Sequence, residues 1–284
     1  MLEEIRALGF EYAELSHGIR ISLLPGILDA VDSGVIKIST LHNFCPLPMG
    51  VDRAAPNVFQ FSSDNPRERE NAFRHTVKTI ETAERLHAPL VVLHMGSVDM
   101  KDYTDRLLEL VGDGKKEKFL KLREEALRKR ADKKERYVRE SSAMLERLIP
   151  VAEKHGVALG IENREALEEI PFDEEAEYLF RDFSTPVIRY WHDTGHAQIK
   201  ANLGIIDHVQ HLDTMSSVLA GFHIHDVEYP GRDHRAPGKG MIDFAALKPF
   251  VKPDQIKVFE MSPSLETEVV MAGVAHVKAI WGNE

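Results

Sequence analysis

The sequence has a single cysteine, fewer basic than acidic residues and no long apolar run. Its single cysteine, Cys45, excludes an intrachain disulfide, and the first segment, MLEEIRALGF, lacks the basic start and apolar core of a signal peptide. No window approaches ~18 apolar residues without charge, which argues against a membrane-spanning helix. These absences predict a cytoplasmic protein with no part in the membrane.

Acidic residues outnumber basic ones. The 36 basic residues against 46 acidic ones give a net charge of −10, which repels polyanions unless a local basic patch outweighs it. This balance argues against nucleic acid as a partner. The 284 residues are 43% hydrophobic and 29% charged, which is enough to bury a full core and excludes disorder as the main state.

Short apolar runs alternate with amphipathic stretches along the chain. Strands that alternate with helices about every thirty residues are typical of βαβ units in a parallel sheet, and so many units favour a closed α/β barrel of the TIM type. A doubly wound sheet is the alternative, but no Gly-x-Gly-x-x-Gly follows an early strand. The seven strand candidates are Glu11–Ser16, Lys37–Asn43, Pro89–Gly96, Ala158–Asn163, Val187–Asp193, Leu219–Asp226 and Ile256–Ser262.

Two features depart from a regular barrel. The chain opens in a helix-like segment, LEEIRALGF, with no strand before it, so the first barrel strand is expected to be absent from this chain. Either the start lies upstream, or another element or a partner completes the sheet. Residues from about 99 to 140 are dominated by charges of both signs, which is typical of a solvated helical insertion. We therefore expect one barrel domain over residues 1–284 that carries this insertion.

Ionisable residues appear where the strand candidates end. Parallel barrel strands bring their carboxyl ends to one mouth, so these side chains are expected to meet there. Carboxylates and imidazoles that converge without a nearby Lys or Arg repel each other, and a divalent cation resolves the conflict. A metal site is the favoured interpretation over scattered polar strand ends. The residues concerned are His42, His94, Glu162, Asp193, His223 and Glu260.

Five motifs extend this pattern into a family resemblance. They are GIENR at Glu162, HDTGHA at 192–197, FHIHD at 222–226, HRAPGKGMIDF at 234–244 and FEMSP at Glu260. In this order they resemble the xylose isomerase-like TIM barrel superfamily, which includes sugar isomerases and epimerases, inosose dehydratases and apurinic endonucleases of the AP endonuclease family 2. The resemblance covers nearly the whole chain except the charged insertion.

The resemblance to the sugar isomerases and epimerases implies one divalent cation held by Glu162, Asp193, His223 and Glu260. Manganese is the expected ion, with zinc, cobalt or magnesium as alternatives. Glu162 and Glu260 would then act as the acid/base pair on a small sugar or related polyol ketone, by way of a metal-stabilised ene-diolate. The expected class is an isomerase or epimerase of carbohydrate metabolism. The oligomeric state stays open, a homo-oligomer included.

The endonuclease members imply an alternative, a zinc-dependent phosphodiesterase. His42, His94, His196 and His234 match additional metal positions there, whereas in an epimerase His196 and His234 would contact the substrate. Arg232 stands where that pattern has an acid, with Asp233 displaced by one. A third alternative is a degenerate barrel that binds a sugar without turning it over.

Three neighbouring residues are candidates for supporting roles. Arg164 lies two positions from Glu162 and is expected to orient that carboxylate or to pair with a surface acid. His225 shares strand parity with His223 and is expected to lie at the rim of the site or to support a ligand, with a solvated histidine as the alternative. Asp226 is placed to accept from a histidine ring. His192 has the opposite parity to Asp193 and is expected to face the helices.

Overall fold

The computed structural model describes residues 1–53 and 57–282. All seven strand candidates form strands of one parallel sheet, each shorter at one or both ends than the sequence pattern suggested. The sheet order is β1-β2-β3-β4-β5-β6-β9, so chain neighbours are mostly sheet neighbours, as the βαβ pattern predicts. The strands are β1 Tyr12–Leu15, β2 Lys37–His42, β3 Leu90–Leu93, β4 Ala158–Glu162, β5 Ile188–Asp193, β6 Leu219–Ile224 and β9 Ile256–Phe259.

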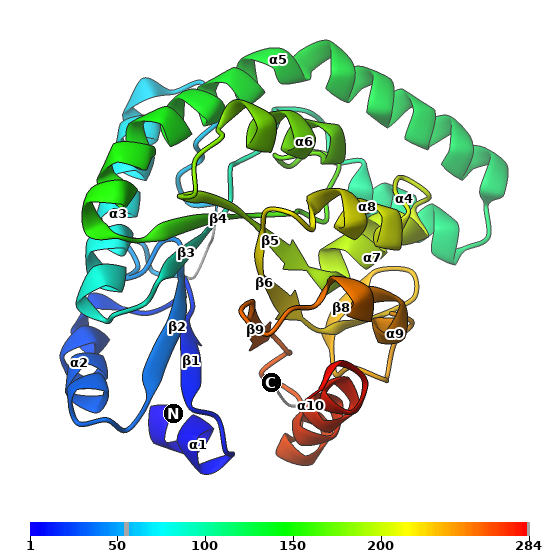
Figure 1. Cartoon of the computed structure of the whole chain (residues 1–284). Helices are drawn as coiled ribbons and strands as arrows, with labels where there is room; N and C mark the ends of the chain where they lie inside the picture. Colours follow the sequence, from blue (N-terminus) through cyan, green and yellow to red (C-terminus); the bar gives the residue numbers. More distant parts are fainter. Residues whose placement is uncertain (54–56, 283–284) are drawn as a thin grey trace. The chain divides into compact units, whose positions relative to one another are not determined.

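Helices connect these strands and confirm the α/β class (Figure 1). The opening segment of the chain is α1, Leu2–Ala7, and β1 follows it. The charged stretch after β3 folds into α4 and the first part of α5. The remaining helices are η1 Ile21–Leu23, α2 Leu24–Asp32, α3 Pro66–Arg85, α4 Thr104–Gly112, α5 Lys116–His155, α6 Asp173–Asp182, α7 Thr194–Asn202, α8 His208–Met215, α9 Phe244–Leu247, η2 Lys248–Phe250 and α10 Thr267–Trp281.

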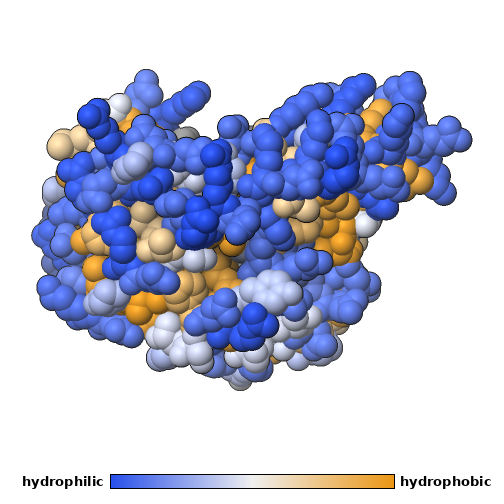
Figure 2. All heavy atoms as spheres, turned by 90° about the horizontal axis from the view of Figure 1, so that it is seen from above, coloured by the Kyte–Doolittle hydropathy of each residue, from blue (hydrophilic) through white to orange (hydrophobic). Residues whose placement is uncertain are grey.

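Helix α5 is long and strongly charged. Its sequence mixes Lys, Arg and Glu around a few apolar positions, as expected for a helix with a solvated face. Hydrophilic residues cover most of the surface seen in Figure 2, which looks down on the side where α5 lies in Figure 1. A single domain with a helical insertion stays a prediction.

Contacts divide the chain into two compact units. The first unit is Met1–Ser97, Arg136–Ile161 and Asp182–Arg189, and it contains β1, β2, β3 and most of β4. The second unit is Val98–Glu135, Glu162–Arg181 and Tyr190–Glu284, and it contains most of β5, all of β6 and β9, and α6 to α10. Strands β4 and β5 have residues in both.

In the second unit, the two faces of β6 have different surroundings. Phe222 and Ile224 lie in a buried cluster with side chains of α8, α9 and α10. Because side chains alternate along a strand, His223 between them faces the opposite side. Strand β6 pairs in parallel with β5, where His223 lies opposite Asp193, and with β9, where Ile224 lies opposite Phe259. Two neighbouring strands therefore bring their ends to His223.

A hairpin follows β6 that the sequence pattern did not reveal. Strands β7, Asp226–Glu228, and β8, Arg232–Arg235, pair antiparallel and form a separate two-stranded sheet. The buried carboxylate of Asp226 anchors the loop beyond the hairpin, because it accepts hydrogen bonds from the backbone N–H groups of Val227, Gly238, Gly240 and Ile242 at 2.8–3.0 Å. The Asp226 carboxylate thus accepts from backbone N–H groups, whereas the sequence analysis expected it to accept from a histidine ring.

Candidate metal centre

Four of the expected ligands converge in the second unit. His223 Nδ1 lies 2.6 Å from Glu162 Oε1, 3.1 Å from Glu260 Oε2 and 3.9 Å from Asp193 Oδ2. Each residue offers a ligand atom within 4.8 Å of the others. Glu260 reaches this point because its backbone N–H donates to Ile224 O at 3.1 Å, which continues the pairing one residue beyond β9. The strand-end argument predicted this convergence.

The centre is buried and strongly acidic. The side chains of Glu162, Asp193 and His223 are at most 1% exposed, while that of Glu260 is 31% exposed. Three carboxylates around one imidazole in a dry site repel each other unless positive charge is supplied. Oxygen donors with one imidazole nitrogen form the set that manganese, magnesium and zinc accept in proteins. The residues present therefore fit a divalent cation.

One positive group does reach the centre, contrary to the premise of the sequence argument. Arg164 Nη1 donates to Glu162 Oε2 at 2.5 Å, and Arg164 Nε donates to Glu169 Oε1 at 3.0 Å. The guanidinium is 8% exposed and is divided between two carboxylates. It neutralises only part of the charge around His223. Arg164 therefore contacts the Glu162 carboxylate, as expected, and also pairs with a second acid, the partly buried Glu169.

Asp193 is held from several sides. Its Oδ1 accepts from the His196 backbone N–H at 2.7 Å, which makes it the N-cap of α7. Asn163 brackets its backbone, accepting from Asp193 N at 2.6 Å and donating to Asp193 O at 3.0 Å. Burial opposes ionisation of the carboxyl, but the hydrogen bond from the His225 ring is among the contacts that lower the pKa of Asp193. Asp193 is thus a fixed, ionised carboxylate.

His196 and His234 stand beside the centre with different partners. His196 Nδ1 lies 3.0 Å from Asn163 O, so its Nδ1–H donates there and Nε2 keeps a lone pair. One ring nitrogen of His196 and carboxylate oxygens of Glu165 and Asp233 lie within 4.8 Å of one another. His234 Nδ1 pairs with Asp233 Oδ2 at 3.0 Å. Burial disfavours the charge on His234, but Asp233 outweighs burial and raises the pKa of His234 to about 9.

Glu165 was missed by the sequence analysis. It lies in the loop after β4, in the run NREALEE, where several glutamates follow one another without strand or helix periodicity. Burial raises the pKa of Glu165. The displaced Asp233 joins the same group, although it is one position away from the family pattern. No spacing signal in the sequence distinguishes Glu165 from its neighbours.

His42 and His94 belong to the first unit. His42 ends β2 and His94 directly follows β3, as the strand-end argument predicts. Both are buried, and their rings lie edge to face with centroids 4.6 Å apart. The His17 ring also packs against His42, with centroids 4.9 Å apart. Their role as further ligands stays a prediction.

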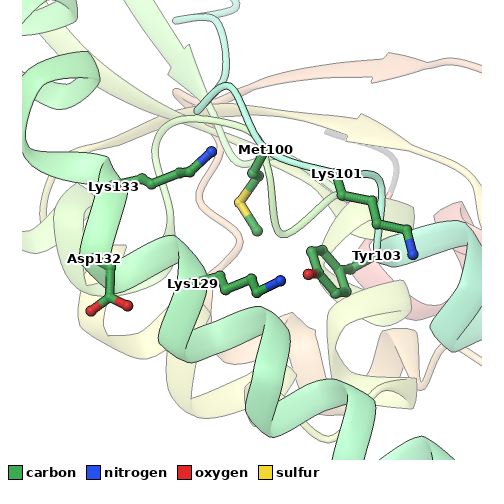
Figure 3. Close-up of a pocket in the computed structure, with 6 residues that line it drawn as sticks. All are labelled: Met100, Lys101, Tyr103, Lys129, Asp132 and Lys133. Carbon is green, nitrogen blue, oxygen red and sulfur yellow. The ribbon is translucent and has the colours of Figure 1, made fainter.

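A pocket lies elsewhere in the second unit (Figure 3). The cavity of about 290 Å³ is lined by Met100, Lys101, Tyr103, Lys129, Asp132 and Lys133. Lys129 approaches the Tyr103 ring at 5.8 Å and also pairs with Glu125 at 3.0 Å. Tyr103 donates to the same glutamate, so two of the polar lining groups share one partner outside the lining. The pocket lacks the convergent acids of the metal centre.

Comparison with known proteins identifies the family. The model of the xylose isomerase-like TIM barrel family matches residues 2–268, so the chain belongs to this family, as the motifs indicated. No curated protein sequence matches the chain.

Among the helices that the structure describes, none has the length and apolarity needed to cross a bilayer.

Solved structures share the fold. A D-tagatose 3-epimerase-like protein matches with TM-score 0.69 and 16% identity over 98% of this chain and 93% of its own. The 3-keto-D-glucoside 4-epimerase of E. coli matches with TM-score 0.68 and 14% identity over 98% and 92%. A D-psicose 3-epimerase from Clostridium cellulolyticum, solved with D-tagatose, matches with TM-score 0.66 and 14% identity over 99% and 92%.

Proposed function

We propose that the protein is a metal-dependent enzyme that epimerises or isomerises a small ketose or related polyol ketone. The observation that carries the proposal is the convergence of Glu162 and Glu260 on one atom of the buried centre, His223 Nδ1, at 2.6 and 3.1 Å. Two carboxylates at one cation site suit a reaction that removes a proton and returns it. The epimerases among the structural neighbours support the substrate class.

Glu162, Asp193, His223 and Glu260 would hold the cation. A divalent ion bound there supplies positive charge to neighbouring oxygens of the ketose and so acidifies the adjacent C–H group. One glutamate takes the proton from that carbon, and the other delivers a proton to the opposite face. The carbon thereby changes configuration with no net gain or loss of atoms. Glu260, the more exposed of the pair, is better placed to meet the substrate.

The surrounding residues hold this pair in place. Arg164 and His223 fix the two oxygens of Glu162, so this carboxylate has little freedom to rotate. His234 lies beside the centre, paired with Asp233, and can donate to a substrate hydroxyl. His196 offers the lone pair of Nε2 as an acceptor for another hydroxyl. These groups suit a polyhydroxylated substrate.

The test follows proton transfer directly. Metal-loaded protein is incubated with a panel of ketopentoses and ketohexoses in D2O, and the recovered sugars are analysed by mass spectrometry and chromatography. We expect one class of ketose to gain deuterium at the carbon next to the carbonyl and to yield its epimer or isomer. Glu260→Gln should abolish both signals while the protein retains its metal. If no ketose exchanges deuterium with fully loaded protein, the proposal is wrong.

A phosphodiesterase is the second candidate. The observation that favours it is the additional group of Glu165, His196 and Asp233, which offers a second set of ligand atoms within 4.8 Å. Several ions suit in-line attack on a phosphodiester, whereas proton transfer needs one. Metal analysis of the purified protein separates the two candidates. Two or three zinc ions per chain, with cleavage of DNA that carries abasic sites, would favour the phosphodiesterase over the ketose enzyme.

A further inference from the structure

We propose that His225 is a positioning residue that fixes Asp193 with one ring nitrogen and fastens the β7–β8 hairpin with the other. The inference rests on the proposed function in one respect, because it takes Asp193 as a ligand of the cation. His225 Nε2 lies 3.0 Å from Asp193 Oδ1 and 3.1 Å from Oδ2. His225 Nδ1 accepts the backbone N–H of His234 at 2.9 Å.

The hairpin contact determines the tautomer of His225. A backbone N–H can only donate, so Nδ1 must carry a lone pair, and the proton of the neutral ring lies on Nε2. That proton points at the Asp193 carboxylate. Two hydrogen bonds therefore follow one another: the His234 backbone N–H donates to Nδ1 of the ring, and Nε2–H of the ring donates to the Asp193 carboxylate. Adding a proton at Nδ1 would break the contact with the hairpin.

Close packing restricts the His225 ring to one position. His225 is completely buried, and its face stacks on the His234 ring with centroids 4.3 Å apart. On the side of α7, a Cβ added to Gly195 would lie 1.9 Å from His225 Cε1. Thr194 Oγ1 donates to His225 O at 2.7 Å and accepts from His225 N at 3.2 Å. Backbone and ring are both held.

This arrangement links two parts of the site. Asp193 lies at the carboxyl end of β5, whereas His234 and Asp233 lie on β8 of the hairpin. A displacement of the hairpin would pull on the ring that orients Asp193. Residues that hold a ligating carboxylate typically contribute 10- to 100-fold to metal affinity. His225 therefore makes cation binding and hairpin order depend on each other.

Two amide substitutions separate the two contacts. The terminal amide of glutamine reaches the position of histidine Nε2, so His225→Gln can still donate to Asp193 but leaves His234 N–H without its acceptor. The amide of asparagine reaches only the position of Nδ1, so His225→Asn can accept from His234 N–H but cannot reach Asp193. His155→Gln is the control, since His155 pairs with Glu84 in the first unit.

The measurements are the dissociation constant for Mn²⁺, by competition with a fluorescent chelator, and hydrogen exchange of residues 226–235 by mass spectrometry. We expect His225→Asn to weaken Mn²⁺ binding roughly 10- to 100-fold with a protected hairpin. His225→Gln should bind Mn²⁺ within a few-fold of the unaltered protein, with faster exchange in the hairpin. The control should change neither quantity. Thermal melting of each variant confirms that it is folded.

Several results would overturn the inference. Equal Mn²⁺ affinity in both variants, whether unaltered or equally weakened, would mean that the ring only fills space. Faster hairpin exchange in His225→Asn than in His225→Gln would reverse the assignment of the two nitrogens. Ketose turnover is assayed separately. If the protein binds Mn²⁺ but converts no ketose, the proposed reaction is wrong, and the Mn²⁺ and exchange measurements still test the role of His225. A protein that binds no divalent ion refutes the metal centre and this inference together.

Discussion

Arg164 donates to the carboxylate of Glu162 at 2.5 Å, with the two side chains 8% and 1% exposed. A buried ion pair loses more when one partner is removed than it contributes as a pair, because the remaining charge is left without compensation. Here the uncompensated group would be a glutamate that already faces two further carboxylates around His223. The guanidinium therefore holds together a centre that is otherwise too negative.

Arg164→Met should accordingly destabilise the metal-free protein, by about 3 kcal/mol. A saturating divalent ion supplies positive charge at the same carboxylate, so the loss should be smaller in the metal-loaded protein. Urea unfolding with and without Mn²⁺ measures both values. Arg106→Met is the matched control, since its pair with Glu109 is exposed and should contribute less than about 1 kcal/mol. An equal loss in both metal states would contradict this account.

Glu260→Gln should separate catalysis from metal binding. The substitution keeps an oxygen that can contact a cation but removes the group that exchanges a proton, and general acid/base catalysis contributes about 10²- to 10⁴-fold. We expect kcat to fall by about that factor while the Mn²⁺ dissociation constant rises less than tenfold. Steady-state kinetics and metal titration provide the two numbers. Glu266→Gln, on the exposed start of α10, should leave both unchanged, and unimpaired turnover in Glu260→Gln would exclude this glutamate as a base.

Strand periodicity made much of the fold and the centre predictable. Alternating side chains predicted which side of β6 carries His223, and the opposite parity of His192 predicted that it faces the helices. In the structure His192 contacts Tyr190 Oη and His208 on that side. Both predictions depend only on the period of two in a strand and on parallel strands ending at one edge.

Strand periodicity could not predict contacts made by loops or by helix packing. Glu165 lies in a loop, where no periodicity relates sequence position to direction. The β7–β8 hairpin has a charged sequence, RDHR, and gains its order from contacts such as that of Asp226 with four backbone N–H groups. His208 meets His192 only because α8 packs behind β5. Each of these contacts is made by tertiary structure and has no local signal.

Gly195→Ala tests the packing that locks His225. The added Cβ would lie 1.9 Å from His225 Cε1, so either the ring or the first turn of α7 must move. Because the ring orients Asp193, we expect Mn²⁺ affinity to fall by at least tenfold, as for loss of a supporting contact. Gly26→Ala is the control: a Cβ there meets nothing within 4 Å inside α2, and alanine should stabilise that helix by about 1 kcal/mol. Unchanged Mn²⁺ affinity in Gly195→Ala would show that the site tolerates displacement of the ring.

Three buried histidines behind β5 should make the protein sensitive to mild acid. Tyr190 Oη lies 2.9 Å from both His192 Nδ1 and His211 Nε2, and His192 Nε2 lies 3.0 Å from His208 Nε2. Burial, reinforced by the neighbouring imidazoles, lowers the pKa of His208 to about 3 and that of His192 well below its usual value. Burial lowers the pKa of His211 to about 4, although Asp173 opposes this shift.

The sign follows from proton uptake on unfolding. Below about pH 6.5 the imidazoles are protonated in the unfolded chain but stay neutral in the folded protein. The free energy of unfolding is therefore highest above pH 6.5 and falls as the pH drops towards 4. Each histidine contributes a slope of up to about 1.4 kcal/mol per pH unit. Urea unfolding at pH 7, 6 and 5 measures the total. His208→Gln should reduce the slope by about one histidine. A slope unchanged in His208→Gln would show that this imidazole is protonated in the folded protein.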